Sequence, residues 1–182
     1  MQILIVALTI FQVLMLILAI LLMLFVASIL VYTILLKVPY VPTRKGNAKA
    51  LFDLAGVKAG ERVLDLGCGD GSILHYGAKH YGISGIGYDL NPVLIILGKV
   101  KGLFMGVSSR VKLCRKDFFS TEWPDVDVIT IYLFPEINAK LEPLLLERYK
   151  GKRVISRAFA LPNLEPSKVT YYKKEKFYRY EL

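Results

Sequence analysis

Val63-Leu64-Asp65-Leu66-Gly67-Cys68-Gly69-Asp70-Gly71 is the stretch that decides the fold of this chain. Its apolar residues, bounded by glycines, predict a short buried strand over 62–66, and the residues after it predict a helix over 72–81. Glycines between a strand and a helix permit a tight turn and let a ligand lie against bare backbone. The stretch therefore predicts the first unit of an α/β sheet and a ligand-binding loop.

The same alternation of strand and helix continues on both sides of this stretch. We expect further strands over 84–90, 110–115, 126–133 and 152–159, and helices over 43–55, 92–105 and 136–149, with Thr43 as the first N-cap. Such alternation predicts a mostly parallel sheet with helices on both faces. Residues 168–174 and 176–180 alternate aromatic and basic side chains, which predicts an antiparallel hairpin at the sheet edge.

Acidic residues in and beside the glycine loop limit the kind of ligand. A dinucleotide loop holds a pyrophosphate, so the carboxylates of Asp65 and Asp70 would be unfavourable there, and its third glycine would fall on Ser72. Carboxylates instead favour a cationic ligand. S-adenosylmethionine (SAM) carries an ammonium and a sulfonium and no phosphate. We therefore predict that Asp65, Gly67, Gly69, Asp70 and Gly71 bind SAM.

Two more acids end the next two predicted strands, at the same edge of the sheet. Asp89 is placed to reach ribose hydroxyls. Asp117 can accept a hydrogen bond from the adenine amino group, and the aromatic Phe118, followed by Phe119, can pack on the ring. Each acid also has a structural interpretation, since Asp70 and Asp89 could cap helices and Asp117 could belong to a turn.

The first 36 residues contain no Asp, Glu, Lys, Arg, Gly or Pro. This run exceeds the roughly 20 apolar residues that cross a bilayer, and it lacks the basic n-region and short apolar core of a cleaved signal peptide. It is also neither Arg-rich nor amphipathic, unlike a mitochondrial presequence. We expect one retained transmembrane anchor over 1–36, a proline-containing linker over 37–42 and a catalytic domain over 43–182.

The formal net charge of +9 arises entirely after residue 36. Basic residues flanking a span favour its cytoplasmic side, so we expect a single-pass protein with a cytoplasmic domain beside anionic lipid. These residues are Lys37, Arg44, Lys45, Lys49 and Lys58. Neither a nucleic-acid-binding signature nor a metal-ligand spacing is present, so no nucleic acid or metal is expected. The lack of a presequence favours a prokaryotic plasma membrane over a mitochondrial one.

The motifs resemble those of the seven-β-strand, class I SAM-dependent methyltransferases, which have a Rossmann-like fold. Within them, Tyr40-Val41-Pro42-Thr43, Tyr88-Asp89-Leu90-Asn91-Pro92, Leu133-Phe134-Pro135 and Leu141-Glu142 are similar to the membrane-associated lysine methyltransferases. That family includes the enzymes for ATP synthase c-subunit and adenine nucleotide translocase. The resemblance adds Leu90 and Asn91 to the cofactor site and implies a membrane-protein substrate. The family commonly has Glu at Asp89 and Ser at Cys68.

The resemblance also bears on the methyl acceptor. A lysine acceptor must be neutral, and an apolar aromatic pocket lowers its pKa by desolvation. Tyr132, Phe134 and Pro135, at the end of the fourth predicted strand, are expected to line that pocket, although the two aromatics could equally be core or rim residues. Two other functions remain open: methylation of a lipid or small hydrophobic molecule, and a non-catalytic SAM-binding adaptor.

Overall fold

The computed structural model describes residues 1–36 and 40–182, and the chain forms two compact units, Met1–Tyr40 and Val41–Leu182. Residues 37–39 of the expected linker lie outside the described residues. The first unit is built around one helix. The second unit holds the sheet and all the candidate site residues.

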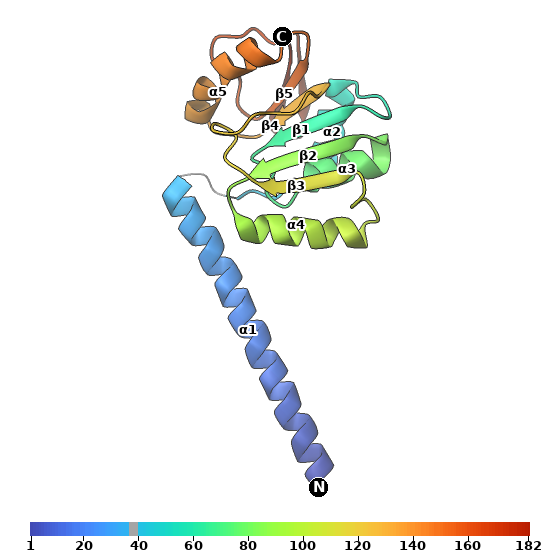
Figure 1. Ribbon diagram of the computed structural model, residues 1–182, viewed down its shortest axis with the longest axis vertical. Helices are drawn as coiled ribbons and strands as arrows, with labels where there is room; N and C mark the ends of the chain where they lie inside the picture. The colour runs from blue at the N-terminus through green and yellow to red at the C-terminus, as the bar shows by residue number, and fades with distance from the viewer. Residues whose placement is uncertain (37–39) are drawn as a thin grey trace. The chain divides into compact units, whose positions relative to one another are not determined.

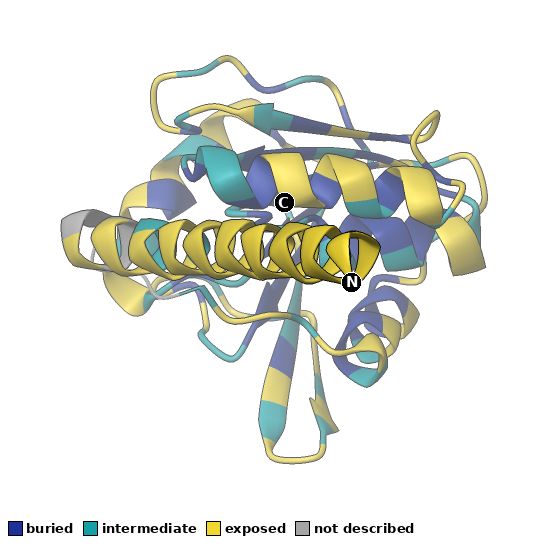
Figure 2. Ribbon diagram, turned by 90° about the horizontal axis from the view of Figure 1, so that it is seen from below, coloured by how far each residue is buried: buried dark blue, intermediate teal, exposed yellow. Residues whose placement is uncertain are grey.

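Helix α1 (Gln2–Leu36) is a single uninterrupted helix, as its lack of glycine and proline predicts. At 1.5 Å per residue it is about 50 Å long, more than the ~30 Å hydrocarbon core of a bilayer. Figure 2 shows nearly all of its described residues coloured as exposed, and its Gln2–Val31 segment is apolar enough to cross a membrane. The polar Thr9 hydroxyl donates a hydrogen bond to the Ile5 carbonyl oxygen, so the helix satisfies this group internally.

Seven strands form the sheet of the second unit (Figure 1). They are β1 (Arg62–Leu66), β2 (Ser84–Asp89), β3 (Val111–Arg115), β4 (Val128–Ile131), β5 (Arg153–Arg157), β6 (Lys168–Tyr172) and β7 (Glu175–Glu181). Their order is β3-β2-β1-β4-β5-β7-β6. Strands β1 to β5 pair in parallel, and β7 pairs antiparallel with β5 and β6. The sheet with its C-terminal hairpin confirms the predicted fold class.

Four helices cover the two faces of this sheet. They are α2 (Lys45–Ala55), α3 (Ser72–Tyr81), α4 (Pro92–Phe104) and α5 (Pro135–Arg148). Side chains alternate along β1, so Val63 packs in the core under α2, α3 and α4, whereas Leu64 and Leu66 pack in the core under α5. This division follows from right-handed crossovers, because the strand order runs one way from β1 to β3 and the other way from β4 to β5.

The α5 face is covered more sparsely than the other. Within residues 40–182, the segments 116–127 and 158–167 join strands without a helix. Buried Phe118, Trp123 and Leu161 from these loops complete the core under α5 instead. One predicted cap was also wrong: α2 has Arg44 at its N-cap position, and the Thr43 hydroxyl accepts a hydrogen bond from Arg157.

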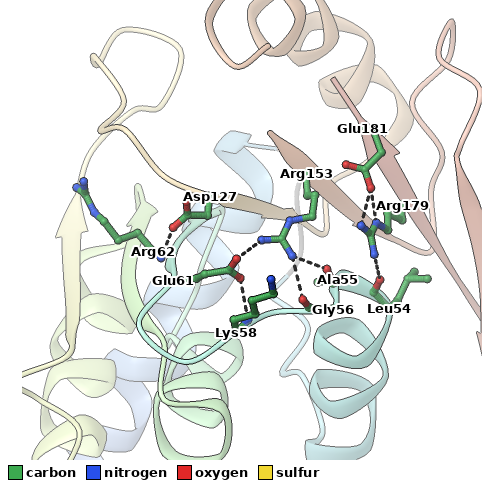
Figure 3. Close-up of polar contacts among 10 residues, drawn as sticks. All are labelled: Leu54, Ala55, Gly56, Lys58, Glu61, Arg62, Asp127, Arg153, Arg179 and Glu181. Carbon is green, nitrogen blue, oxygen red and sulfur yellow. Dashed lines mark hydrogen bonds and ion pairs between the residues drawn. The ribbon is translucent and has the colours of Figure 1, made fainter. Parts of the chain in front are cut away.

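An arginine network lies at the end of the sheet where the parallel strands begin (Figure 3). The Arg153 guanidinium donates to the carbonyl oxygens of Ala55 and Gly56 at the end of α2 and forms an ion pair with Glu61 at 2.6 Å. Arg179 donates to the Leu54 carbonyl oxygen in the same way. These cations satisfy helix carbonyls that lack partners within the helix. These contacts give this end of the sheet a structural role.

Candidate active site

The candidate site lies at the carboxyl ends of the parallel strands. Strand order reverses between β1 and β4, and open α/β sheets bind ligands at such a switch point. The register places Asp65 between Gly87 of β2 and Thr130 of β4. The loops that follow these three strands therefore carry the glycine loop, the Asp89 segment and the Tyr132 segment to one edge.

Asp65 forms the buried floor of the glycine loop, with 2% of its surface exposed. Its Oδ1 accepts a hydrogen bond from the Thr130 hydroxyl at 2.7 Å. Among the residues that the structure describes, none provides a hydrogen bond to its Oδ2. Burial raises the pKa of Asp65 to about 7, and the Asp89 and Asp70 carboxylates add to this rise against the Thr130 hydrogen bond. A buried carboxylate oxygen without a donor fits the ammonium group of SAM.

The glycine loop has a backbone shape that other residues would disturb. Gly67 and Gly71 have φ angles of +78° and +69°, in the left-handed region that favours glycine. A Cβ on Gly67 would lie 2.8 Å from Leu133, and one on Gly71 would lie 2.8 Å from Leu113. Gly69 also has a positive φ, of +55°. Backbone conformation and the leucines packed against the loop therefore both favour glycine at positions 67 and 71, and contact of the loop with the cofactor stays a prediction.

Asp89, at the end of β2, is held by backbone donors on both of its oxygens. The Gly69 N–H donates to Oδ2 and the Asn91 N–H donates to Oδ1, both at 2.8 Å. Burial raises the pKa of Asp89, and these backbone hydrogen bonds partly offset the rise. Each carboxylate oxygen can accept a second hydrogen bond, so the fixed side chain suits a pair of ribose hydroxyls.

Asp70 makes the contacts of a structural residue. Its Oδ1 accepts hydrogen bonds from the N–H and hydroxyl of Ser72, at the start of α3. Its Oδ2 pairs with Lys101 of α4 at 2.7 Å. Burial raises the pKa of Asp70, but the hydrogen bonds from Lys101 and Ser72 outweigh it and the net pKa lies below its usual value. Asp70 is not the N-cap of α3, since Gly71 occupies that position without a side-chain cap, and the cofactor role of Asp70 stays a prediction.

The segment after Asp89 begins α4. The Asn91 side-chain oxygen accepts hydrogen bonds from the N–H groups of Val93 and Leu94, so Asn91 is an N-cap followed by proline at the first helical position. The Leu90 carbonyl oxygen accepts a hydrogen bond from Arg115. Asn91 and Leu90 thus fix the path of the chain beside Asp89, and direct contact with the cofactor stays a prediction.

Asp117 and Phe118 follow β3 at the same edge. Asp117 Oδ1 accepts a hydrogen bond from the Phe119 N–H at 2.9 Å, which is the contact of a turn. Phe118 is buried in the core under α5, whereas Phe119 is 39% exposed. The ring with exposed surface at this point is therefore Phe119, and the adenine contacts of Asp117 and Phe118 stay predictions.

The expected acceptor residues lie after β4, beside the glycine loop. Tyr132 and Phe134 are half-buried and Pro135 is exposed at the start of α5. The Phe134 ring lies 5.6 Å from that of Phe159. The Arg157 guanidinium lies 4.0 Å above the Tyr132 ring, so one face of this ring is already covered. The half-exposed rings form an apolar edge, and the role of these residues in binding the acceptor stays a prediction.

Sequence reasoning missed Arg157, which connects several parts of the chain. Its side chain is 3% exposed and pairs with Glu175 at 2.5 Å. It also donates to the Thr43 hydroxyl, while Asn47 donates to the same Glu175 carboxylate. The available signal was an arginine at the end of a buried apolar strand, where an unpaired charge is costly.

The protein-family model described as the ANTKMT methyltransferase domain matches residues 65–168, which is more than half of the chain. A protein-lysine N-methyltransferase from Saccharolobus islandicus is 31% identical over 72% of this chain and 83% of its own length. The mouse adenine nucleotide translocase lysine N-methyltransferase is 32% identical over 81% of this chain, which spans 64% of that enzyme.

Solved structures show the same fold with a product of the cofactor bound. An RNA methyltransferase from Salinibacter ruber, in complex with S-adenosyl-L-homocysteine, superposes with a TM-score of 0.75 at 30% identity. The match covers 78% of this chain and 93% of that one. The site geometry and these likenesses agree on the cofactor. The chain belongs to the family of ANTKMT methyltransferase domains, and it is a SAM-dependent methyltransferase.

Proposed function

We propose that this protein-lysine N-methyltransferase methylates a lysine of an integral membrane protein, close to the bilayer in which α1 is anchored. The observation that carries the proposal is α1, a long apolar helix on a chain of this family. The mouse relative supports it, since its name gives a membrane carrier as its substrate. A tether raises the effective concentration of targets in the same membrane, which suits a domain without large insertions.

SAM, when bound, supplies an electrophilic methyl group on a sulfonium. In the proposed site, Asp65 Oδ2 receives the ammonium group, because it is a buried acceptor without a donor. Asp89 holds the ribose hydroxyls with its backbone-fixed carboxylate. Asp117 and its neighbouring aromatic rings mark the adenine end. This chain thus contributes positioning and charge complementarity.

The acceptor side must present a neutral amine. A bond forms between the lysine nitrogen and the methyl carbon while the sulfur–carbon bond breaks, and the extra proton on nitrogen leaves to solvent. The apolar edges of Tyr132, Phe134 and Pro135 disfavour the charged ammonium by desolvation. Arg157 holds the Tyr132 ring in place by stacking on one of its faces, which leaves the other face for the acceptor. Arg157 is a positioning residue in this scheme.

We also propose that the catalytic unit faces the cytoplasm. The first basic residues after α1, which lie in 37–58, outnumber the acidic ones. Positive residues next to a span favour retention on the cytoplasmic side. Accessibility of an added exposed cysteine to an impermeant reagent, in intact cells and in inverted vesicles, tests this orientation.

The experiment uses membranes that contain the full chain and SAM labelled on its methyl group. Protein, lipid and RNA are separated and counted, and labelled protein is hydrolysed to identify the methylated amino acid. Asp89→Ala serves as the inactive control, since it removes the ribose carboxylate. Label in one protein band as methyl-lysine, absent with Asp89→Ala, is expected.

Label in the other fractions would contradict the proposed acceptor. Lipid label would move the function to a lipid or small hydrophobic molecule. RNA label would instead give this chain the acceptor named for the Salinibacter structure. Binding of SAM without label in any fraction, in membranes from the native host, would favour a SAM-binding adaptor.

A further inference from the structure

Helix α4 carries a stripe of apolar side chains that its own domain leaves uncovered. Leu103 is 67% exposed and Phe104 is 89% exposed, far above what a core-facing helix shows. The other members of the stripe, also exposed, are Ile96, Leu97 and Val100. At 100° per residue these five positions fall within an arc of about 120°. The opposite side of α4 carries Leu94, Ile95 and Gly98, which are buried against the sheet.

Basic residues border the stripe, and α4 itself carries no acidic residue. Around the helix axis, Lys99 flanks one side of the stripe, and Lys101, whose ammonium group pairs with Asp70, flanks the other. The sequence from residue 90 to 116 contains no Asp or Glu. Exposed cations continue onto the edge strand β3 and its ends, as Arg110, Lys112, Arg115 and Lys116. An apolar stripe bordered by lysines, on a helix without Asp or Glu, is typical of a helix that lies in the membrane interface.

The chain itself indicates which apolar surface lies within reach. The nine residue steps from the end of α1 to the start of α2 span at most about 30 Å when extended. A domain on such a tether stays close to the bilayer that α1 would cross. Cations beside the stripe complement anionic lipid headgroups, which attract basic residues near the surface.

We propose that α4 docks on the lipid bilayer, with its stripe (Ile96, Leu97, Val100, Leu103 and Phe104) below the headgroups and Lys99 at them. This second contact is separate from α1 and independent of the acceptor's identity. Since α4 begins directly after the Asp89 segment, docking fixes the height and tilt of the cofactor edge of the sheet above the membrane. A lysine close to the bilayer surface then meets the site in a restricted orientation.

The test measures membrane depth in the full chain, reconstituted in vesicles of phosphatidylcholine and phosphatidylglycerol. A spin label is placed at Leu103→Cys or, as the matched control, at Leu146→Cys, in a Cys114→Ser background. Leu146 is likewise an exposed leucine on a helix, but α5 lies on the other face of the sheet. Each variant is checked for S-adenosylhomocysteine binding to show that it is folded.

Accessibility of each label to oxygen and to a water-soluble nickel chelate gives the depth. We expect the label at position 103 to favour oxygen, with a positive depth parameter, and the label at 146 to favour the chelate, with a negative one. Equal chelate access at both positions would overturn the proposal. Shielding of position 103 from both reagents would also overturn it, because a second copy or another protein would then cover the stripe.

A second depth measurement tests this inference without depending on the proposed acceptor. Leu103→Gln with Phe104→Gln is expected to shift the depth of a label at Val100→Cys towards water and to leave S-adenosylhomocysteine binding unchanged. Leu146→Gln should change neither quantity. Because depth is measured without an acceptor, the docking proposal can stand or fall whether or not lysine methylation is found.

Discussion

Asp65 shows how one buried carboxyl can link protonation to ligand binding. Its pKa, raised by burial to about 7, far exceeds the usual value of 3.8. Between these two values the folded chain holds a proton that the unfolded chain has lost. Stability therefore falls as pH rises through this window, and above it the cost of burying the charge stays constant. A bound cationic ligand lowers the pKa of Asp65, since it favours the ionised carboxylate.

We expect S-adenosylhomocysteine to bind about tenfold more tightly at pH 8 than at pH 6, because the higher pH ionises Asp65. Isothermal titration calorimetry across this range measures the effect. Asp65→Asn should bind more weakly and lose the pH dependence. A wild-type affinity that does not change with pH would contradict the role given to this carboxyl.

Arg157 supports a second prediction at the residue scale. Arg157→Lys keeps the charge but loses the planar group that pairs with Glu175 and stacks on Tyr132. We expect methyl transfer to slow about tenfold while cofactor affinity stays unchanged. Poorer positioning of the Tyr132 ring that raises the activation free energy by about 1.4 kcal/mol gives that factor. The control is Arg179→Lys, which alters an arginine at the structural edge of the sheet. Equal loss in both variants would indicate a general effect on stability.

At the scale of elements, α4 joins the two functions assigned to this domain. Its N-cap Asn91 fixes the chain beside Asp89, and Lys101 holds Asp70. Its glycines let it lie close to the cofactor loop: a Cβ on Gly98 would lie 2.4 Å from Leu113 and 2.7 Å from the Asp70 carbonyl oxygen. Close packing of α4 on the loop therefore places the exposed stripe and the cofactor site in one rigid arrangement.

Gly98→Ala should destabilise the domain, although helix propensity alone predicts the opposite. Alanine is favoured over glycine inside a helix by about 1 kcal/mol, but overpacking costs about 1–3 kcal/mol, and here it meets backbone as well as a side chain. We expect a net loss of about 1 kcal/mol and weaker cofactor binding. Denaturant titration followed by Trp123 fluorescence measures the change. Lys99→Ala, at the neighbouring exposed position, should be close to neutral, and stabilisation by Gly98→Ala would contradict the packing.

At the scale of the whole molecule, the proposed function gives α1 and the catalytic unit different roles. Helix α1 is long and apolar enough to cross a membrane, and the domain Val41–Leu182 contains the residues proposed to bind the cofactor and the acceptor. A tether of this kind acts through effective concentration and needs no specific contact with the target.

Removing residues 1–36 should lower methylation of the membrane target at least tenfold, because the effective concentration of target sites is lost. Replacing the same residues with an equally long leucine-rich helix should restore it, and cofactor affinity should be equal in all three proteins. Labelled membranes and a binding titration give the two measurements. Failure of the leucine-rich helix to restore methylation would mean that α1 itself recognises the target.

The sequence by itself determined the fold class, the apolar helix and the order of elements. These depend on local properties: glycine at positive φ in the loop, period-two and helical patterns, and a run of 36 residues without charge. The carboxyl ends of β1, β2 and β3 could also be placed together, since parallel strands end at one edge. Boundaries were close, although the fourth strand is shorter than expected, at Val128–Ile131.

Only the tertiary structure decided which side chains meet. Asp70 pairs with Lys101 across 31 residues, and Arg157 reaches Thr43 across 114. Phe118 turned into the core because residues 116–127 replace a helix on that face. The exposed stripe of α4 was equally hidden in the sequence, since its apolar residues read as core until packing left them uncovered. Pairing and exposure depend on which elements pack together, and a one-dimensional pattern does not contain that information.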